Sequence, residues 1–334
     1  MRRWGSVLAV MIAVACGSSG GGGNGFNTDG GSSGGSSGAG SDSGGGSGGG
    51  SGSGGSSGGF LGGDGSVSDA QGNCTAPDML IVLDHTDSMS AEPTGKKPPN
   101  TMAGHMLSKW YLATQAIKAV VAPPSDTKIS FGLELFPLDP QTVDAGAGMG
   151  SCMTLSQLLA GMASTNKQCQ PAEVPIPPAS GTGMAITNLL DPETLRLCVS
   201  TPIALALGTA RAELQSIAHG VAQYVLLVTD GGETCKGDVT GVAQQLATAG
   251  IKTFVVGFGG VTGGAGGVNV PLLDNVACAG ETAQGFPTPC TKGAAGYTAT
   301  STTGPPLFYS AQDGASLQTA LAAITKSVCC GCAQ

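Results

Sequence analysis

A carboxylate and two hydroxyls stand at alternate positions of this sequence, in a spacing that could bind an ion. Asp84, Thr86 and Ser88 follow directly after the apolar run Met79–Leu83. Alternate residues of an extended segment point to the same side, so these three side chains could meet one small cation. Hard divalent cations such as Mg²⁺ prefer oxygen ligands. The spacing therefore predicts a cation site whose few protein oxygens leave one coordination position open.

Strands and helices must alternate along the chain to position this segment. Uninterrupted or alternating apolar residues predict strands, and these cover Met79–Leu83, Lys128–Phe136, Tyr224–Val228, Ile251–Phe258 and Pro306–Tyr309. Apolar residues at helical spacing predict helices, and these cover Met106–Val121, Ile203–Ile217, Val239–Ala249 and Leu317–Val328. The alternation predicts an α/β fold, doubly wound, with a mainly parallel sheet and helices on both faces.

A second carboxylate is expected at the same edge of that sheet. Asp230 follows the strand Tyr224–Val228 almost at once, as Asp84 follows its own strand. In doubly wound sheets, ligands bind beyond the carboxyl ends of the strands. Thr201 precedes Pro202 at the predicted start of a helix, where we expect it to be the N-cap.

The segment from Pro137 to Ser200 lacks a clear period and is rich in Pro and Gly. Within it, Glu173–Pro177 is expected as an edge strand, because Pro is tolerated only at sheet edges, and the rest as a loop pinned by a disulfide. Connectivity does not follow from sequence. Our working pairs are Cys152–Cys169, Cys278–Cys290, Cys198–Cys235, and Cys74 with Cys329, Cys330 or Cys332.

The order of these motifs resembles the von Willebrand factor type A domain, over about Pro77 to Val328. That family's metal-ion-dependent adhesion site has Asp-x-Ser-x-Ser after the first strand, a Thr from a later loop, and an Asp after the fourth strand. The matching positions here are Asp84, Thr86, Ser88, Thr201 and Asp230. The sequence departs from the pattern in having Thr at 86, and Asp87 where Gly is common.

The resemblance implies a function as well as a fold. The hydroxyls of Thr86, Ser88 and Thr201 would ligate the ion or exchange with water, and Asp84 and Asp230 would act mostly through water. The ion is expected to be Mg²⁺, with Mn²⁺ or Ca²⁺ as alternatives, and its open position would accept an Asp or Glu of a protein partner. In this family such binding couples to the last helix.

Simpler interpretations apply to several neighbours of the site. His85 is expected to be an ordinary loop or core residue and Asp87 a solvated carboxylate. Glu233 is expected either on the surface or behind the site, where it would support the ligands without contacting the ion. An envelope scaffold without ion binding remains an alternative function. A metal-dependent hydrolase using Ser88 with His105 or His219 is a further one, but no Gly-x-Ser-x-Gly elbow surrounds Ser88, so we do not expect an enzyme.

The N-terminal part predicts export. Residues 1–16 combine Arg2-Arg3 with a short apolar core, as in a signal peptide, and Cys16 stands where bacterial lipoproteins carry their lipid. Of 11 cysteines, an odd number, ten would remain to pair if Cys16 is lipidated. Residues 17–72 are expected to be a Gly/Ser tether and residues 73–334 the folded domain. A secreted form is the alternative to an anchor in the outer membrane or at the cell surface.

The charge of the chain narrows the class of partner. The formal net charge is −8, and no basic patch is present in the sequence. Nucleic acid is therefore not an expected partner.

Overall fold

A computed structural model describes residues 75–141, 150–166, 169–217, 220–260, 267–301 and 303–329. All of them belong to one unit of the chain, Phe60–Gln334. The predicted signal segment and the whole predicted tether lie outside the described residues, and so do Cys16, Cys74, His219, Cys330 and Cys332.

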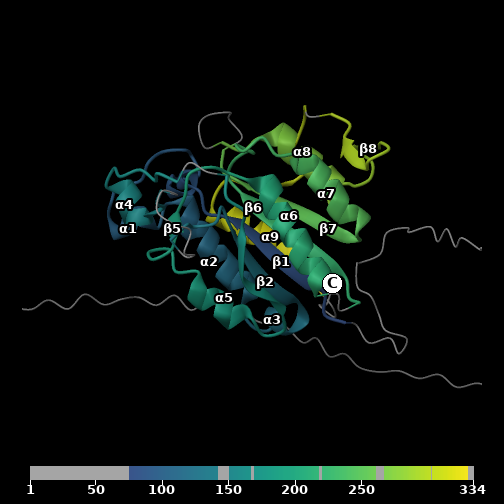
Figure 1. Ribbon diagram of the computed structural model, residues 1–334, viewed down its shortest axis with the longest axis horizontal. Helices are drawn as coiled ribbons and strands as arrows, with labels where there is room; N and C mark the ends of the chain where they lie inside the picture. Colours follow the sequence, from purple (N-terminus) through teal and green to yellow (C-terminus); the bar gives the residue numbers. More distant parts are fainter. Residues whose placement is uncertain are drawn as a thin grey trace, which may run out of the picture. The chain divides into compact units, whose positions relative to one another are not determined.

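A six-stranded sheet forms the centre of the fold, in the order β10-β7-β6-β1-β2-β4 (Figure 1). Its strands are β1 (Asp78–Asp84), β2 (Ser130–Phe136), β4 (Glu173–Ala179), β6 (Gln223–Thr229), β7 (Ile251–Phe258) and β10 (Tyr309–Ala311). All neighbours pair in parallel except β2 and β4, which are antiparallel. The mainly parallel sheet is thus confirmed, with the Pro-rich edge strand where the sequence predicts it. The short strand expected at Pro306–Tyr309 starts later, as β10.

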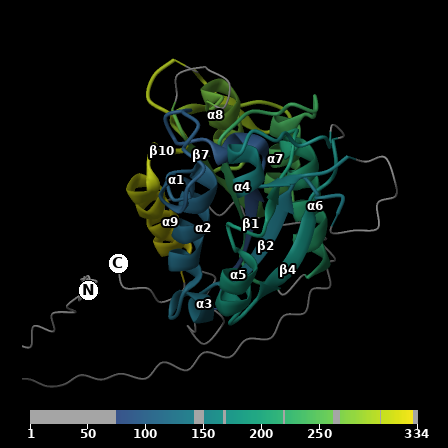
Figure 2. The same ribbon diagram turned by 90° about the vertical axis from the view of Figure 1, so that its left-hand side faces the viewer.

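Helices cover both faces of this sheet, as predicted. They are η1 (Asp87–Ser90), α1 (Met102–His105), α2 (Lys109–Val121), α3 (Ser125–Lys128), α4 (Leu155–Leu159), α5 (Gly183–Leu189), α6 (Ile203–Ser216), α7 (Val239–Thr248), α8 (Val270–Ala279) and α9 (Gly314–Val328). In Figure 2, α2 and α9 lie on one side of the sheet and α6 and α7 on the other.

The two faces explain why β1 is apolar throughout. Ile81 and Leu83 pack in the core beneath α2 and α9, whereas Leu80 and Val82 pack in the core beneath α6 and α7. A strand covered on both sides has no solvent-facing positions, so its sequence shows no alternation.

One helix begins later than the sequence pattern indicates, and another has a different N-cap, because capping contacts decide how a helix starts. α2 begins at Lys109 rather than Met106, since the Ser108 side chain accepts a hydrogen bond from the Tyr111 N–H. The N-cap of α6 is Pro202, not Thr201. Glu233 Oε2 accepts the Ala204 N–H at 2.9 Å, so a carboxylate from another loop caps α6.

The segment from 137 to 200 is more ordered than a loop. It holds α4, α5, and the strands β3 (Met153–Thr154) and β5 (Arg196–Leu197), which pair with each other. Short elements of this kind leave no apolar period to read. The same reason applies to the hairpin of β8 (Cys290–Lys292) and β9 (Tyr297–Ala299), which was not predicted either. The longer helix α8 was also not predicted.

Three disulfides brace the described part of the fold. Cys278–Cys290 is confirmed, but the other two pairs are Cys152–Cys198 and Cys169–Cys235. The predicted Cys152–Cys169 and Cys198–Cys235 pairs are therefore wrong. Pairing of β3 with β5 places Cys152 beside Cys198, a long-range contact that spacing does not reveal. The pairing proposed for Cys74 lies outside the described residues.

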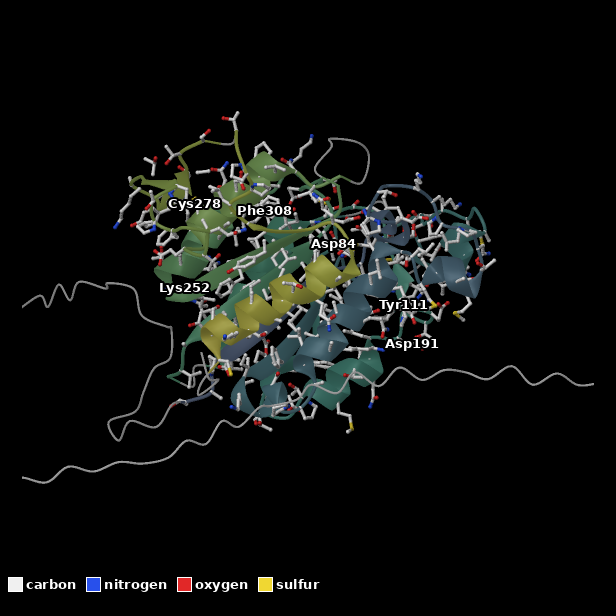
Figure 3. The ribbon with its side chains drawn as sticks, turned by 180° about the vertical axis from the view of Figure 1, so that it is seen from behind. Asp84, Tyr111, Asp191, Lys252, Cys278 and Phe308 are labelled. Atoms are coloured by element: carbon white, nitrogen blue, oxygen red, sulfur yellow. A yellow bond between two sulfur atoms is a disulfide. The ribbon has the colours of Figure 1, made fainter. Side chains whose placement is uncertain are left out.

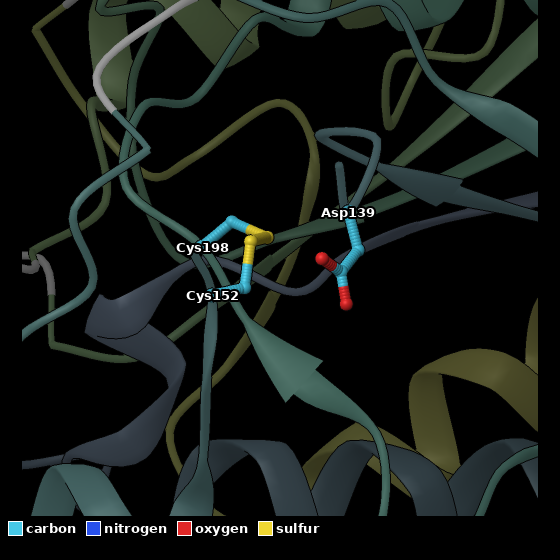
Figure 4. A group of neighbouring side chains, drawn as sticks. All are labelled: Asp139, Cys152 and Cys198. Atoms are coloured by element: carbon cyan, nitrogen blue, oxygen red, sulfur yellow. A yellow bond between two sulfur atoms is a disulfide. The ribbon is translucent and has the colours of Figure 1, made fainter. Parts of the chain in front are cut away.

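One of these disulfides lies beside a carboxylate, and the three side chains together have the composition of a metal site. Asp139, Cys152 and Cys198 present ligand atoms within 4.8 Å of one another (Figure 4). The two sulfurs are bonded to each other, so neither is a thiolate able to bind metal. Asp139 instead pairs with Arg196 Nε at 2.8 Å. The cluster is a structural brace.

Candidate metal site

Adjacent parallel strands bring Asp84 and Asp230 to one edge of the sheet. β1 and β6 pair from Asp78↔Gln223 to Leu83↔Val228, so the residues after them emerge side by side. Figure 3 shows Asp84 and Lys252 toward opposite ends of the strands, as expected for the carboxyl end of β1 and the amino end of β7. The predicted position of both carboxylates at the carboxyl edge is confirmed.

Hydrogen bonds join four of the five predicted site residues. Thr86 Oγ1 and Ser88 Oγ lie 2.8 Å apart, and Ser88 Oγ donates to Asp230 Oδ1 at 2.8 Å. Asp84 Oδ1 accepts the Thr86 N–H at 2.9 Å. These contacts connect segments 142 residues apart in sequence, which confirms that the two motifs meet.

The fifth residue, Thr201, is held at this edge by its backbone. Its N–H donates to Thr234 Oγ1 at 2.6 Å, and its carbonyl accepts the Thr234 N–H at 3.1 Å. Thr201 is buried. These two bonds attach the backbone of Thr201 to the loop that comes after Asp230. The Thr201 hydroxyl does not cap α6.

A sixth oxygen supports the first carboxylate. Thr229 Oγ1 donates to Asp84 Oδ2 at 2.6 Å, and Thr229 is fully buried. Both oxygens of Asp84 are thus engaged, which fixes the orientation of its carboxylate. Thr229 was not among the predicted site residues, although its position next to Asp230 in the sequence could have indicated it.

Burial makes the negative charge of the site costly. Asp84 and Asp230 are both fully buried. Burial raises the pKa of Asp84 to about 7, and the charge of Asp230 adds to this shift. Burial also raises the pKa of Asp230, although the Lys109 ammonium opposes this shift. A cation bound between the two carboxylates would relieve both costs.

Lys109 is the main residue that the sequence analysis missed. It is the first residue of α2, and its Nζ lies 2.5 Å from Asp230 Oδ2 with both side chains fully buried. A signal was present in the sequence. Lys is disfavoured at the positive amino end of a helix, and it stands there beside the apolar residues of the helix's buried stripe.

The donor chemistry at this edge fits a hard divalent cation. Hydroxyl and carboxylate oxygens are the ligands that ions such as Mg²⁺ prefer. The two 2.8 Å separations at Ser88 are ordinary hydrogen-bond distances. They show that these oxygens converge, and they do not select one ion over another.

The residues between the site residues have structural roles. His85 is buried, as expected, and its two ring nitrogens face the carbonyl oxygens of Arg196 and Pro137. Burial lowers the pKa of His85. Asp87 is less solvated than expected, since its Oδ1 accepts a hydrogen bond from Ser164 at 2.7 Å. Both residues tie the site loop to the cysteine-bearing segment.

Ser88 lacks the surroundings of a nucleophile. Its hydroxyl contacts Thr86 and Asp230, and neither of these contacts is a histidine. His105 Nδ1 lies 2.9 Å from Glu193 Oε2, and its Nε2 lies 2.9 Å from Asn100 Oδ1. Both nitrogens of His105 are thus already engaged, and His219 lies outside the described residues.

The fold and this edge together define a doubly wound α/β domain with oxygen-bearing side chains gathered at one sheet edge. In agreement, residues 190–282 match the family model of the von Willebrand factor type A domain. The matched segment contains Thr201 and Asp230. It begins at residue 190, so it does not include the loop of Asp84. No curated protein matches the sequence.

Several solved structures are similar in fold. BatB from Bacteroides thetaiotaomicron has a TM-score of 0.35 and 18% identity, covering 55% of this chain and 66% of BatB. Proximal thread matrix protein 1 from the mussel byssus, with a zinc-occupied MIDAS motif, has a TM-score of 0.46 and 13% identity, covering 76% of this chain and 48% of its own. The minor pilin PilB from Streptococcus sanguinis has a TM-score of 0.46 and 13% identity, with 76% and 61% covered. This chain spans less than two thirds of each of them.

None of the helices in the described ranges is long and apolar enough to cross a bilayer.

Proposed function

We propose that this chain is a binding module of the cell envelope that engages an acidic group of a protein partner through a divalent cation. The observation that carries the proposal is the linkage of Asp84, Thr86, Ser88 and Asp230 at one sheet edge, where hydroxyl and carboxylate oxygens of the kind that Mg²⁺ prefers converge. The von Willebrand factor type A domain, whose family model matches residues 190–282, is typically used in protein–protein interaction and adhesion.

The chain's own residues would divide the work as follows. The hydroxyls of Thr86 and Ser88, with Thr201, would face the ion, and Asp84 and Asp230 would balance its charge. A bound divalent ion would supply a Lewis-acidic position for a carboxylate oxygen of the partner. Thr229 and the Thr86 N–H keep the Asp84 carboxylate in one orientation, so the site is prepared before the ion arrives.

Exposed apolar side chains support a protein as partner. Met102, Met106 and Leu107 are solvent-exposed in the segment between the site loop and α2. Methionine adapts its shape readily and is common at protein-binding surfaces. The segment leads directly into Lys109, which contacts the site.

The location follows from the N-terminal segment. We propose export, followed by lipidation at Cys16 and display on the Gly/Ser tether of residues 17–72, a coil of roughly 40 Å root-mean-square span. Release as a secreted protein is the alternative. Mass spectrometry of the mature N-terminus distinguishes the two, since lipid adds its mass to Cys16.

Calorimetric titration of the full chain with MgCl₂, after treatment with EDTA and dialysis, tests the metal site. We expect saturable binding that Asp84→Asn abolishes. Asp126→Asn is the matched control, because Asp126 is also buried but lies in α3, before the amino end of β2 and thus at the opposite sheet edge. Binding that survives Asp84→Asn, or no binding at millimolar Mg²⁺ even with sodium acetate present as a carboxylate ligand, contradicts the proposal.

A second function is favoured by one observation. The Lys109–Asp230 ion pair supplies a positive charge to the site from the protein itself, as a scaffold without ion binding would need. Capture of partners from an envelope extract with Mg²⁺ and with EDTA separates the two functions. Equal recovery in EDTA supports the scaffold.

A further inference from the structure

Lys109 places a fixed positive charge inside the candidate metal site. Its Nζ is 2.5 Å from Asp230 Oδ2, and neither side chain is accessible to solvent. The other oxygen of the same carboxylate, Oδ1, accepts the hydrogen bond from Ser88. Asp230 is therefore shared between the ammonium on one side and the ligand hydroxyls on the other.

The surroundings hold the ammonium in this place. The Lys109 N–H donates to the Ala91 carbonyl at 2.8 Å, which ties the start of α2 to the end of the site loop. A Cβ on Gly259, after β7, would lie 3.8 Å from Lys109 Nζ. The ammonium thus lies where the loops after β1, β6 and β7 meet, and it cannot reach water without moving one of them.

This position is unfavourable for a lysine unless its charge is used. The amino end of a helix carries partial positive charge, which repels a cation in the first turn. Burial of an ammonium costs several kcal/mol before pairing. An apolar residue would fill the space without either cost, so the positive charge itself is the property that the site uses.

The charges of the site balance only when two ligands are bound. Asp84, Asp230 and Lys109 together carry one net negative charge. A divalent cation alone would leave one net positive charge in a buried place. A carboxylate from a partner would then bring the total to zero, whereas a site without Lys109 would already be neutral with the cation alone.

We propose that Lys109 couples the two binding events, weakening the binding of a divalent cation alone and strengthening it when a carboxylate ligand is present. This inference rests on the proposed function. It adds that the affinity for the cation depends on whether a carboxylate ligand is bound. The ion and the acidic partner would bind together, and neither alone would bind tightly.

Titration of the full chain with MgCl₂, with and without sodium acetate as the carboxylate probe, tests the coupling without any substitution. We expect acetate to raise the Mg²⁺ affinity of the natural chain by about fivefold or more. Sodium chloride at the same ionic strength is the control. Equal Mg²⁺ affinity in acetate and chloride overturns the inference.

Lys109→Met, which keeps the length of the side chain and removes its charge, tests the residue. We expect Mg²⁺ affinity without acetate to rise by about tenfold or more, and the effect of acetate to fall below about twofold. Lys118→Met, on the same helix, is the matched control. Lys109→Arg keeps the charge, so acetate should still raise its Mg²⁺ affinity. If the Met variant does not fold, the comparison of acetate with chloride in the natural chain still tests the inference.

The outcomes separate this inference from the proposed function. Unchanged or weaker Mg²⁺ binding in Lys109→Met, with normal binding in the natural chain, overturns the role of Lys109 alone. Mg²⁺ binding in Lys109→Met without acetate, and in the natural chain only with acetate, supports both. No binding in either chain contradicts both.

Discussion

The carboxylates at the sheet edge and Glu134 on β2 are equally hidden from solvent, but their surroundings differ in kind. Asp84 accepts hydrogen bonds from Thr86 and Thr229, and Asp230 faces Ser88 and Lys109. Both oxygens of Glu134 have no hydrogen-bond partner. Burial raises the pKa of Glu134 well above its ordinary value, and nearby Glu213 adds to this.

The difference shows which observation indicates a site. A raised pKa is common to both places, so it marks burial and not function. Donors and hydroxyls that converge from separate strands occur only at the edge after β1 and β6 in this comparison. Glu134 lies within a strand, next to apolar residues of β1, and its simplest stable state is the protonated acid.

The largest effect is expected from Asp230→Asn, which breaks the ion pair at the sheet edge. The Lys109 ammonium would stay buried without its carboxylate, at a cost of about 3–5 kcal/mol in the free energy of unfolding. Urea denaturation measures it. The double variant Asp230→Asn/Lys109→Met should recover part of the loss, and a failure to recover any would contradict the importance of the pair.

Two of the disulfides test whether the site depends on local bracing or only on the stability of the whole fold. Replacing Cys152 and Cys198 by Ala should lower the free energy of unfolding by about 2–4 kcal/mol. It should also weaken Mg²⁺ binding, because the Cys198 carbonyl and N–H hold the backbone of Asp87 and His85. Removing the Cys278–Cys290 pair should destabilise the fold but leave Mg²⁺ affinity unchanged. Equal effects on affinity would contradict this division.

Glu134→Gln tests the buried carboxylate on β2 whose oxygens have no hydrogen-bond partner. Because the folded protein holds the Glu134 proton more tightly than the unfolded chain, stability falls as pH rises above the ordinary Glu pKa of about 4.3. The variant removes this loss, so we expect it to be more stable than the natural chain by about 1–3 kcal/mol at pH 8 and similar at pH 4. Thermal melting across this pH range measures it, with Glu281→Gln as control. A destabilised variant at pH 8 would show that the charge of Glu134 is used.

The smallest effect is expected from Ser164→Ala, which removes the hydrogen bond to Asp87. Loss of one such bond should cost about 1 kcal/mol of stability. If Asp87 only braces the loop, Mg²⁺ affinity should change by less than about twofold. A larger change would place Asp87 among the residues that set the charge of the ion site.

Much of the fold could be predicted because it depends on patterns within short windows. The apolar run before Asp84 and the helical stripe of α7 each report local burial, and Gly250, with a φ of +81°, ends α7 as its position suggests. The order of the motifs likewise placed Asp84 and Asp230 at one sheet edge, since parallel strands share that edge.

The sequence by itself thus determined the class of fold and the sheet edge at which Asp84, Thr86, Ser88 and Asp230 meet. Only the tertiary structure decided that Lys109 faces Asp230, that Glu233 caps α6, and which cysteines pair. The physical reason is that these contacts depend on where distant segments pack in space. No local period or spacing encodes such packing, and a charge brought in from a neighbouring helix can change what the same five side chains bind.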